Sequence, residues 1–213
     1  MDSLLESIIL SFSGFLSVGS IVLVLLLLIS NQNIKQAAAF VSGYIFGYSF
    51  IGIMYVYAGS KLVKGGELIP PAFVFVVGLL LIYVGLKNLL KKRQAKPKEA
   101  KIFTLIRKLT AKRAFLFGLL ITVINIKNLA IFISIVSVIS ASEVEFFTKI
   151  FVVFIDTFIF CLAMIILICI RAILRDLATS ILIKIKAWID KNSRHIMTFL
   201  PTVFGLYFIF KVV

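Results

Sequence analysis

Acidic residues, histidine, cysteine and proline are all scarce in this chain of 213 residues. Only nine residues are Asp or Glu and His195 is the only histidine, so the clustered ligands of a transition-metal site are missing. No Ser, His and Asp constellation indicates a hydrolase, and we expect neither an enzyme nor a cofactor. Cys161 and Cys169 lie eight residues apart in one apolar stretch, beyond disulfide reach along a helix, which excludes a disulfide framework.

Charged residues make up only 15% of the chain, whereas 62% of the residues are hydrophobic. A soluble domain is about one quarter charged and could not bury such an apolar excess. The composition therefore predicts an integral membrane protein whose main partner is the lipid bilayer. The formal net charge of +14 is then expected in loops that face the anionic cytoplasmic leaflet, and no nucleic-acid partner is expected.

Six stretches are long enough to cross a bilayer as helices, because a hydrocarbon core of about 30 Å needs roughly 20 apolar residues. They are continuous apolar runs without two-residue alternation, which favours helices over a barrel. The predicted fold is therefore an all-α integral membrane protein with six transmembrane helices. The predicted spans are residues 4–30, 36–58, 68–90, 114–140, 146–170 and 196–212.

Basic residues lie almost entirely on one side of this six-span arrangement. Eighteen Lys or Arg residues fall in the turn at Lys35 and in the segments 87–113 and 171–194, against four on the opposite side. The positive-inside rule places these three segments in the cytoplasm and both termini outside, in a multi-pass protein of the plasma membrane. Within residues 172–191, apolar residues such as Leu177 and Trp188 recur at helical spacing, which predicts an amphipathic helix on the cytoplasmic interface.

The basic linker, residues 91–113, divides the chain into two parts, residues 1–90 and 114–213, with three spans each. An odd number of spans per half means that repeated halves must be inverted relative to each other. In such repeats, binding sites often lie at the midplane where corresponding helices are interrupted. The sequence therefore predicts two inverted three-helix repeats.

Polar residues interrupt the first and the fourth predicted spans at corresponding depths. Ser17 and Ser20 lie in the first span, and Asn125, Lys127 and Asn128 lie in the fourth. At 1.5 Å per residue, both positions are about 20 Å from the end at which each span starts. We expect Ser17–Ser20 to overlay Asn125–Asn128 after inversion, with a departure from regular helix at one position at least.

Lys127 and Asp156 are the only charges deep within the predicted spans, and both are placed near mid-depth. A lone charge there costs about 2.5–3.5 kcal/mol, so each needs a partner and they are the obvious partners for each other. The functional interpretation is a substrate- or proton-binding pair that faces a cavity. The alternative is a structural ion pair between the fourth and fifth spans.

The uncharged polar residues also have two interpretations each. Asn125 and Asn128 would coordinate substrate or form hydrogen bonds between helices. Ser17 and Ser20 would line the same site or bond to their own helix. Gly43 and Gly47 form a G-x-x-x-G pattern, which we interpret as a helix-packing surface.

Residues 124–130, Ile-Asn-Ile-Lys-Asn-Leu-Ala, resemble the Asn-Pro-Lys-Asn-Leu element of the GAP (peptidoglycolipid-addressing) family of the lysine-exporter (LysE) superfamily. Residues 17–21 and the glycine-containing residues 40–47 resemble the motifs of the first two spans of that family. Ile126 stands where the family element has proline, and Val18 and Ser20 replace the prolines of the first motif. The resemblance implies a protein that moves glycolipid or lipid-linked material to the cell surface.

The leading functional hypothesis is a small secondary transporter of the exporter type, with a midplane site formed by the first, fourth and fifth spans. One cation, one anion and several amides suit an amphoteric or anionic lipid headgroup, or an amino acid. The alternative is a membrane assembly or partner protein whose polar core is structural. A divalent-cation exporter would need several buried acids or histidines. A homodimer is one assembly that would enclose a wider pathway than a single protomer of this size.

Overall fold

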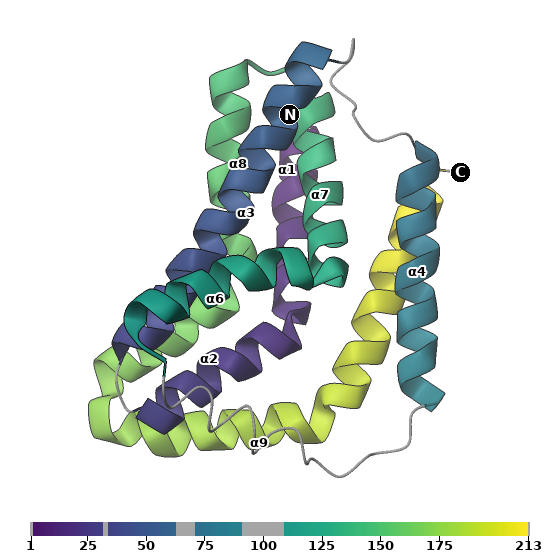
Figure 1. Ribbon diagram of the computed structural model, residues 1–213. Coiled ribbons are helices and arrows are strands. Elements are labelled where there is room, and N and C mark those ends of the chain that lie inside the picture. Colours follow the sequence, from purple (N-terminus) through teal and green to yellow (C-terminus); the bar gives the residue numbers. More distant parts are fainter. Residues whose placement is uncertain (1, 32–33, 63–70, 91–108, 213) are drawn as a thin grey trace.

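The structure is a computed structural model that describes residues 2–31, 34–62, 71–90 and 109–212 (Figure 1). All regular elements in these ranges are helices, in agreement with the predicted all-α class. Most of the predicted linker (residues 91–113) and the first residues of the third predicted span (68–70) lie outside the described residues.

The first predicted span is a broken helix. It consists of α1 (Asp2–Ser11), the 3-10 helix η1 (Phe12–Leu16) and α2 (Val18–Asn31), and its two arms are bent by 54°. Ser17 separates η1 from α2 with a non-helical backbone (φ −74°, ψ 51°). The break falls in a stretch of serine and glycine, which are weaker helix formers than the leucines on either side.

The fourth predicted span is broken as well, between α6 (Ala111–Ile124) and α7 (Ile126–Ala141), with a bend of 76°. Asn125 lies at the break with a non-helical backbone (φ −82°, ψ 71°), and its side chain accepts a hydrogen bond from the backbone N–H of Asn128. Asparagine is a preferred residue at this capping position because it satisfies an N–H that the helix leaves unpaired. The expected departure from regular helix is thus confirmed at both positions, without proline.

A third break, which the sequence analysis did not anticipate, separates α8 (Phe146–Phe160) from α9 (Leu162–Val212) by a bend of 60° at Cys161. Within α9, Arg175 adopts a positive φ of 42° and kinks the helix. The buried guanidinium of Arg171 donates to the carbonyl of Arg175 and to the hydroxyl of Thr179, both at 2.8 Å. Arg171 therefore satisfies a backbone carbonyl at the kink.

The remaining helices are α3 (Ile34–Leu62) and α4 (Pro71–Leu90). Among the described residues, one helix segment, Ile34–Ser60 of α3, is long and apolar enough to cross a membrane by itself. The number rises to as many as four if each bent pair is one span. These helices agree with the predicted helical membrane protein, whereas the six spans and the inverted repeats stay predictions.

The helices form an upright group with a slanted layer below it in Figure 1. Helices α1, α3, α7 and α8 run side by side, and α2 and α6 slant across their lower ends. The middle of α9 crosses the bottom of the molecule, and its last part turns upward along α4. Gly78 and Gly205 bring α4 and the end of α9 together, since a Cβ on Gly205 would lie 2.6 Å from the Gly78 carbonyl oxygen.

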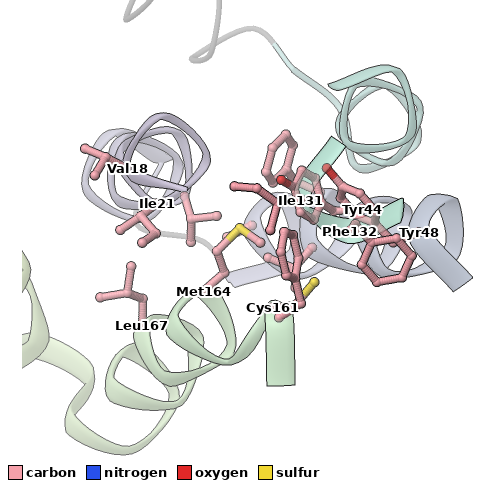
Figure 2. Packing of buried hydrophobic residues seen from close by; sticks show 14 of the residues in the cluster. Val18, Ile21, Tyr44, Tyr48, Ile131, Phe132, Cys161, Met164 and Leu167 are labelled. Atoms are coloured by element: carbon pink, nitrogen blue, oxygen red, sulfur yellow. The ribbon is translucent and has the colours of Figure 1, made fainter. Parts of the chain in front are cut away.

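The core is a cluster of buried aromatic and aliphatic side chains between the broken helices (Figure 2). The ring of Tyr48 from α3 lies 4.7 Å from that of Phe132 from α7 and 5.1 Å from that of Phe160 from α8, measured between ring centroids. Met164 and Leu167 extend the cluster from the start of α9 toward Val18 and Ile21 of α2. Close van der Waals packing of these side chains thus holds the three breaks together.

Helices α3 and α6 approach each other very closely where they cross. A Cβ on Gly43 would lie 2.1 Å from the Phe115 carbonyl oxygen, and a Cβ on Gly118 would lie 2.1 Å from the Phe40 carbonyl oxygen. Gly47, one turn after Gly43, faces the side chain of Thr122. The structure therefore places both glycines of the G-x-x-x-G pattern in this crossing.

The predicted interfacial helix, residues 172–191, lies within α9 and contacts the protein through Ala178, Leu182 and Ile189. Leu177 and Trp188, from the predicted apolar stripe, are 72% and 60% exposed. The apolar residues of this segment therefore cover two sides of the helix, one toward the bundle and one away from it.

Candidate functional site

The break between η1 and α2 and the break between α6 and α7 meet at a buried polar cluster. This cluster consists of Ser17, Ser20, Tyr44 and Asn128. The Asn128 amide donates to the Ser17 hydroxyl and, at 3.1 Å, to the hydroxyl of Tyr44. Ser20 donates to the same tyrosine oxygen at 3.2 Å, and the Ser17 oxygen lies 3.3 Å from it. Three of the predicted site residues are thus brought together in one hydrogen-bonded cluster.

Tyr44 of α3 is the centre of this cluster, and the sequence analysis missed it. Its side chain is fully buried, and a buried tyrosine hydroxyl normally finds a hydrogen-bond partner. The available signal was its position between Gly43 and Gly47, where α3 packs closely against another helix. The second span therefore contributes to the site in addition to the first and fourth.

Asn125 and Lys127 lie beside the cluster on the same turn of chain, and both are half-buried. Lys127 lies in the first turn of α7, next to Ile126, which is 75% exposed. The partial positive charge at a helix N-terminus and the lysine ammonium both attract anions. This turn is therefore a positively charged position at the edge of a buried polar cluster.

Asp156 does not form the predicted ion pair with Lys127. Among the described residues, neither of its carboxyl oxygens has a hydrogen-bond partner, although the side chain is fully buried. The side chains that face it are Ser7 and Ser11 of α1. The reason is that α8 turns this residue toward α1, whereas Lys127 lies in the first turn of α7, next to the break at Asn125.

The break at Cys161 lies directly against the break in the first helix. A Cβ on Gly14 of η1 would lie only 1.9 Å from the carbonyl oxygen of Phe160, the last residue of α8. Only glycine permits this approach, because every other side chain would overlap the backbone of α8. The first broken helix therefore contacts both others, through Gly14 and through Ser17.

No group of three or more His, Cys, Asp or Glu side chains that would hold a metal ion occurs in the described part of the chain. The polar cluster instead offers hydroxyl and amide groups, with one ammonium at its edge. Such groups bind polar or anionic parts of a ligand.

We expect Tyr44→Phe to destabilise the protein by about 1–3 kcal/mol, because Ser17, Ser20 and Asn128 lose a shared partner in a buried place. Tyr48→Phe is the matched control on the same helix. The hydroxyl of Tyr48 has no hydrogen-bond partner among the described residues, so its removal should leave stability unchanged or raise it. Thermal unfolding of the purified variants in detergent measures both effects, and equal losses would contradict the role of the cluster.

Comparison with known protein families gives one match. A family model described as "Sap, sulfolipid-1-addressing protein" matches residues 8–212, from within α1 to the end of α9. No curated protein matches the chain, and no solved structure does.

Proposed function

Because the chain belongs to the sulfolipid-1-addressing protein family, we propose that it moves an anionic lipid or glycolipid to the cell surface. The family description names a sulfolipid, whose polar group is anionic, as the material that is addressed. The resemblance of residues 124–130 to the GAP element of the LysE superfamily supports an exporter. Both arguments point to the same substrate class.

The observation that carries the proposal is the position of Lys127. Lys127 is half-buried and lies in the first turn of α7, where the helix dipole has its positive end. The positive end of the helix dipole and the lysine charge both favour an anion at this position. A sulfate or phosphate headgroup supplies such an anion, and Asn125 lies within two residues to donate a hydrogen bond from its side-chain amide.

We also propose that six spans form two inverted repeats around this site. Elements that correspond in the two halves contact each other, as expected for elements that lie close to a two-fold axis in the membrane plane. Ser17 in the first helix bonds to Asn128 in the fourth, and Gly52 of α3 faces Val153 of α8. The third helices of the two halves also contact each other, since Gly78 of α4 faces Gly205 of α9. The halves differ in that α3 is straight whereas α8 and α9 are separated by a break.

The second candidate function is a membrane assembly protein with a structural polar core. The observation that favours it is that Ser17, Ser20, Tyr44 and Asn128 bond to one another and are buried. A deletion strain separates the two functions. Export predicts a specific lipid that is lost from the cell surface and retained inside, whereas an assembly role predicts broad loss of a membrane complex. Comparison of extracted surface lipids with total lipids measures this difference.

The proposed topology places both termini outside and the basic segments inside. In Figure 1 the two chain ends lie toward the top, opposite the middle of α9 with its basic residues. A reporter that is active only in the cytoplasm should be silent when fused after Val213 and active when inserted near Lys96. Activity of the Val213 fusion would contradict the six-span topology, and inactivity at Lys96 would contradict the cytoplasmic linker.

A further inference from the structure

A second buried polar site lies apart from the cluster around Tyr44, between α8 and α1. It consists of Asp156 and the two serines that face it, Ser7 and Ser11, and all three side chains are fully buried. Ser7 and Ser11 lie one turn apart on α1, so their hydroxyl groups lie on the same face of the helix. This arrangement presents two oxygen atoms to one carboxyl group.

The hydrogens of both hydroxyl groups are already used within α1. Ser7 donates to the carbonyl of Leu4 at 2.9 Å, and Ser11 donates to the carbonyl of Ser7 at 3.0 Å. A serine hydroxyl has one hydrogen, so only lone pairs remain to face Asp156. An ionised carboxylate also presents only lone pairs. A hydrogen carried by the carboxyl group itself would satisfy both sides of this contact and leave the two bonds within α1 intact.

Charge compensation from elsewhere is also lacking at Asp156. Helix α8 packs against α1, η1, α3, α7 and α9. Among the described residues of these elements, the side chains beside the carboxyl group are the neutral Ser7 and Ser11, and no cation forms a hydrogen bond with its oxygens. Glu6, the nearest acid on α1, bonds instead to the hydroxyl of Tyr207. Burial of a carboxylate without a cation is costly, so Asp156 takes up a proton more readily than an exposed carboxylate does.

We propose that Asp156, Ser7 and Ser11 form a binding site for one proton, in which the carboxylic acid donates to a serine oxygen. On the proposed export function, loading and release of this proton are linked to movement of the lipid. Four side-chain oxygens in a fully buried place suit a proton better than a metal cation, since Ca²⁺, for example, takes six to eight oxygen ligands.

The segment η1 connects the proton site to the cluster around Tyr44. Ser11 is the last residue of α1, and Ser17 follows the last residue of η1. A short 3-10 stretch inside a longer helix often marks a hinge. Ionisation of Asp156 would place a negative charge against the lone pairs of Ser7 and Ser11 and push α1 away from α8. That movement reaches Ser17, and through it the Asn128 amide at the α7 break.

Infrared spectroscopy of the purified wild-type protein tests the site without any lipid substrate. We expect the carbonyl band of a protonated carboxylic acid at mildly acidic pH, where exposed carboxyl groups are ionised, its loss at high pH, and its absence in Asp156→Asn. Glu6→Gln is the control that should keep the band, because Glu6 bonds to Tyr207 instead. Ser11→Ala should shift the frequency of the band, because it removes a hydrogen-bond acceptor.

Three outcomes would overturn the proposal: no band at any pH, a band that survives Asp156→Asn, or a band that sodium removes at constant pH. The last outcome would assign the site to a metal cation.

The link to export has a separate test, because the infrared result does not depend on the function. Asp156→Asn should reach normal abundance, since asparagine imitates the neutral acid, but should not restore the surface lipid in a deletion strain. If Asp156→Asn restored the surface lipid while the wild-type protein showed the infrared band, the link between the proton and export would be wrong. The proton site and the export function would both remain.

Discussion

The Lys127→Met variant should reach the membrane at wild-type abundance and leave the surface lipid of a deletion strain unrestored. Lys127 lies in the first turn of α7, where its charge opposes the helix dipole, so its removal should not weaken the helix. A hydrogen bond from an ammonium to an anionic headgroup contributes about 1.5–3 kcal/mol. Its loss corresponds to roughly 10- to 100-fold weaker binding. Immunoblots of membranes and analysis of surface lipids measure the two quantities.

Lys149→Met is the matched control, because Lys149, on α8, places its ammonium at the other end of α7. Its ammonium donates to the carbonyl of Ser140 in the last turn of α7 at 2.6 Å, where a cation is stabilising. That variant should lose abundance but retain export per molecule, the opposite of Lys127→Met. Lys127→Arg should retain part of the export, since it keeps the charge. Full export by Lys127→Met would rule out Lys127 as a headgroup ligand.

Of the substitutions that add a single methyl group at the three breaks, Gly14→Ala should lower the stability of the protein most. The new Cβ would lie 1.9 Å from the Phe160 carbonyl oxygen, which is backbone and cannot turn aside. Overpacking typically costs about 1–3 kcal/mol, and a backbone clash belongs at the upper end of that range. We expect a clearly lowered unfolding temperature in detergent and reduced abundance in membranes.

Gly19→Ala is the control, because Gly19 is an exposed position five residues further along the same broken helix. No atom lies within 4 Å of a Cβ at Gly19, and alanine is a better helix former there. Its stability should be unchanged or higher by up to about 1 kcal/mol. If Gly14→Ala were as stable as Gly19→Ala, the contact between the first and third breaks would not hold the structure together.

The sequence determined the membrane class and two of the three breaks. A chain with this excess of apolar residues can avoid contact with water only in the bilayer. Composition alone therefore predicts a membrane protein. Serines and asparagines in an apolar helix compete for backbone hydrogen bonds locally, so Ser17 and Asn125 identified their breaks without any tertiary contact. These features are local or compositional.

The break at Cys161 and the central position of Tyr44 came only from the tertiary structure. The sequence at Phe160–Leu162 has no proline or glycine, and the glycine that allows α8 to end there is Gly14, far away in the chain. Tyr44 likewise acquires its role from partners on two other helices. Contacts between distant segments depend on how helices cross, and residue order along one segment carries little of that information.

The surroundings of Asp156 show most clearly that contacts between distant segments cannot be predicted from the sequence. Counting residues along a helix at 1.5 Å each gives the depth of a charge, and it placed Asp156 and Lys127 at similar depth. Depth does not give the direction in which a side chain points, because three bends, of 54°, 76° and 60°, reorient the helices that carry these residues. The sequence thus determined that Asp156 is buried in a membrane helix, and only the tertiary structure decided that it faces Ser7 and Ser11 rather than Lys127.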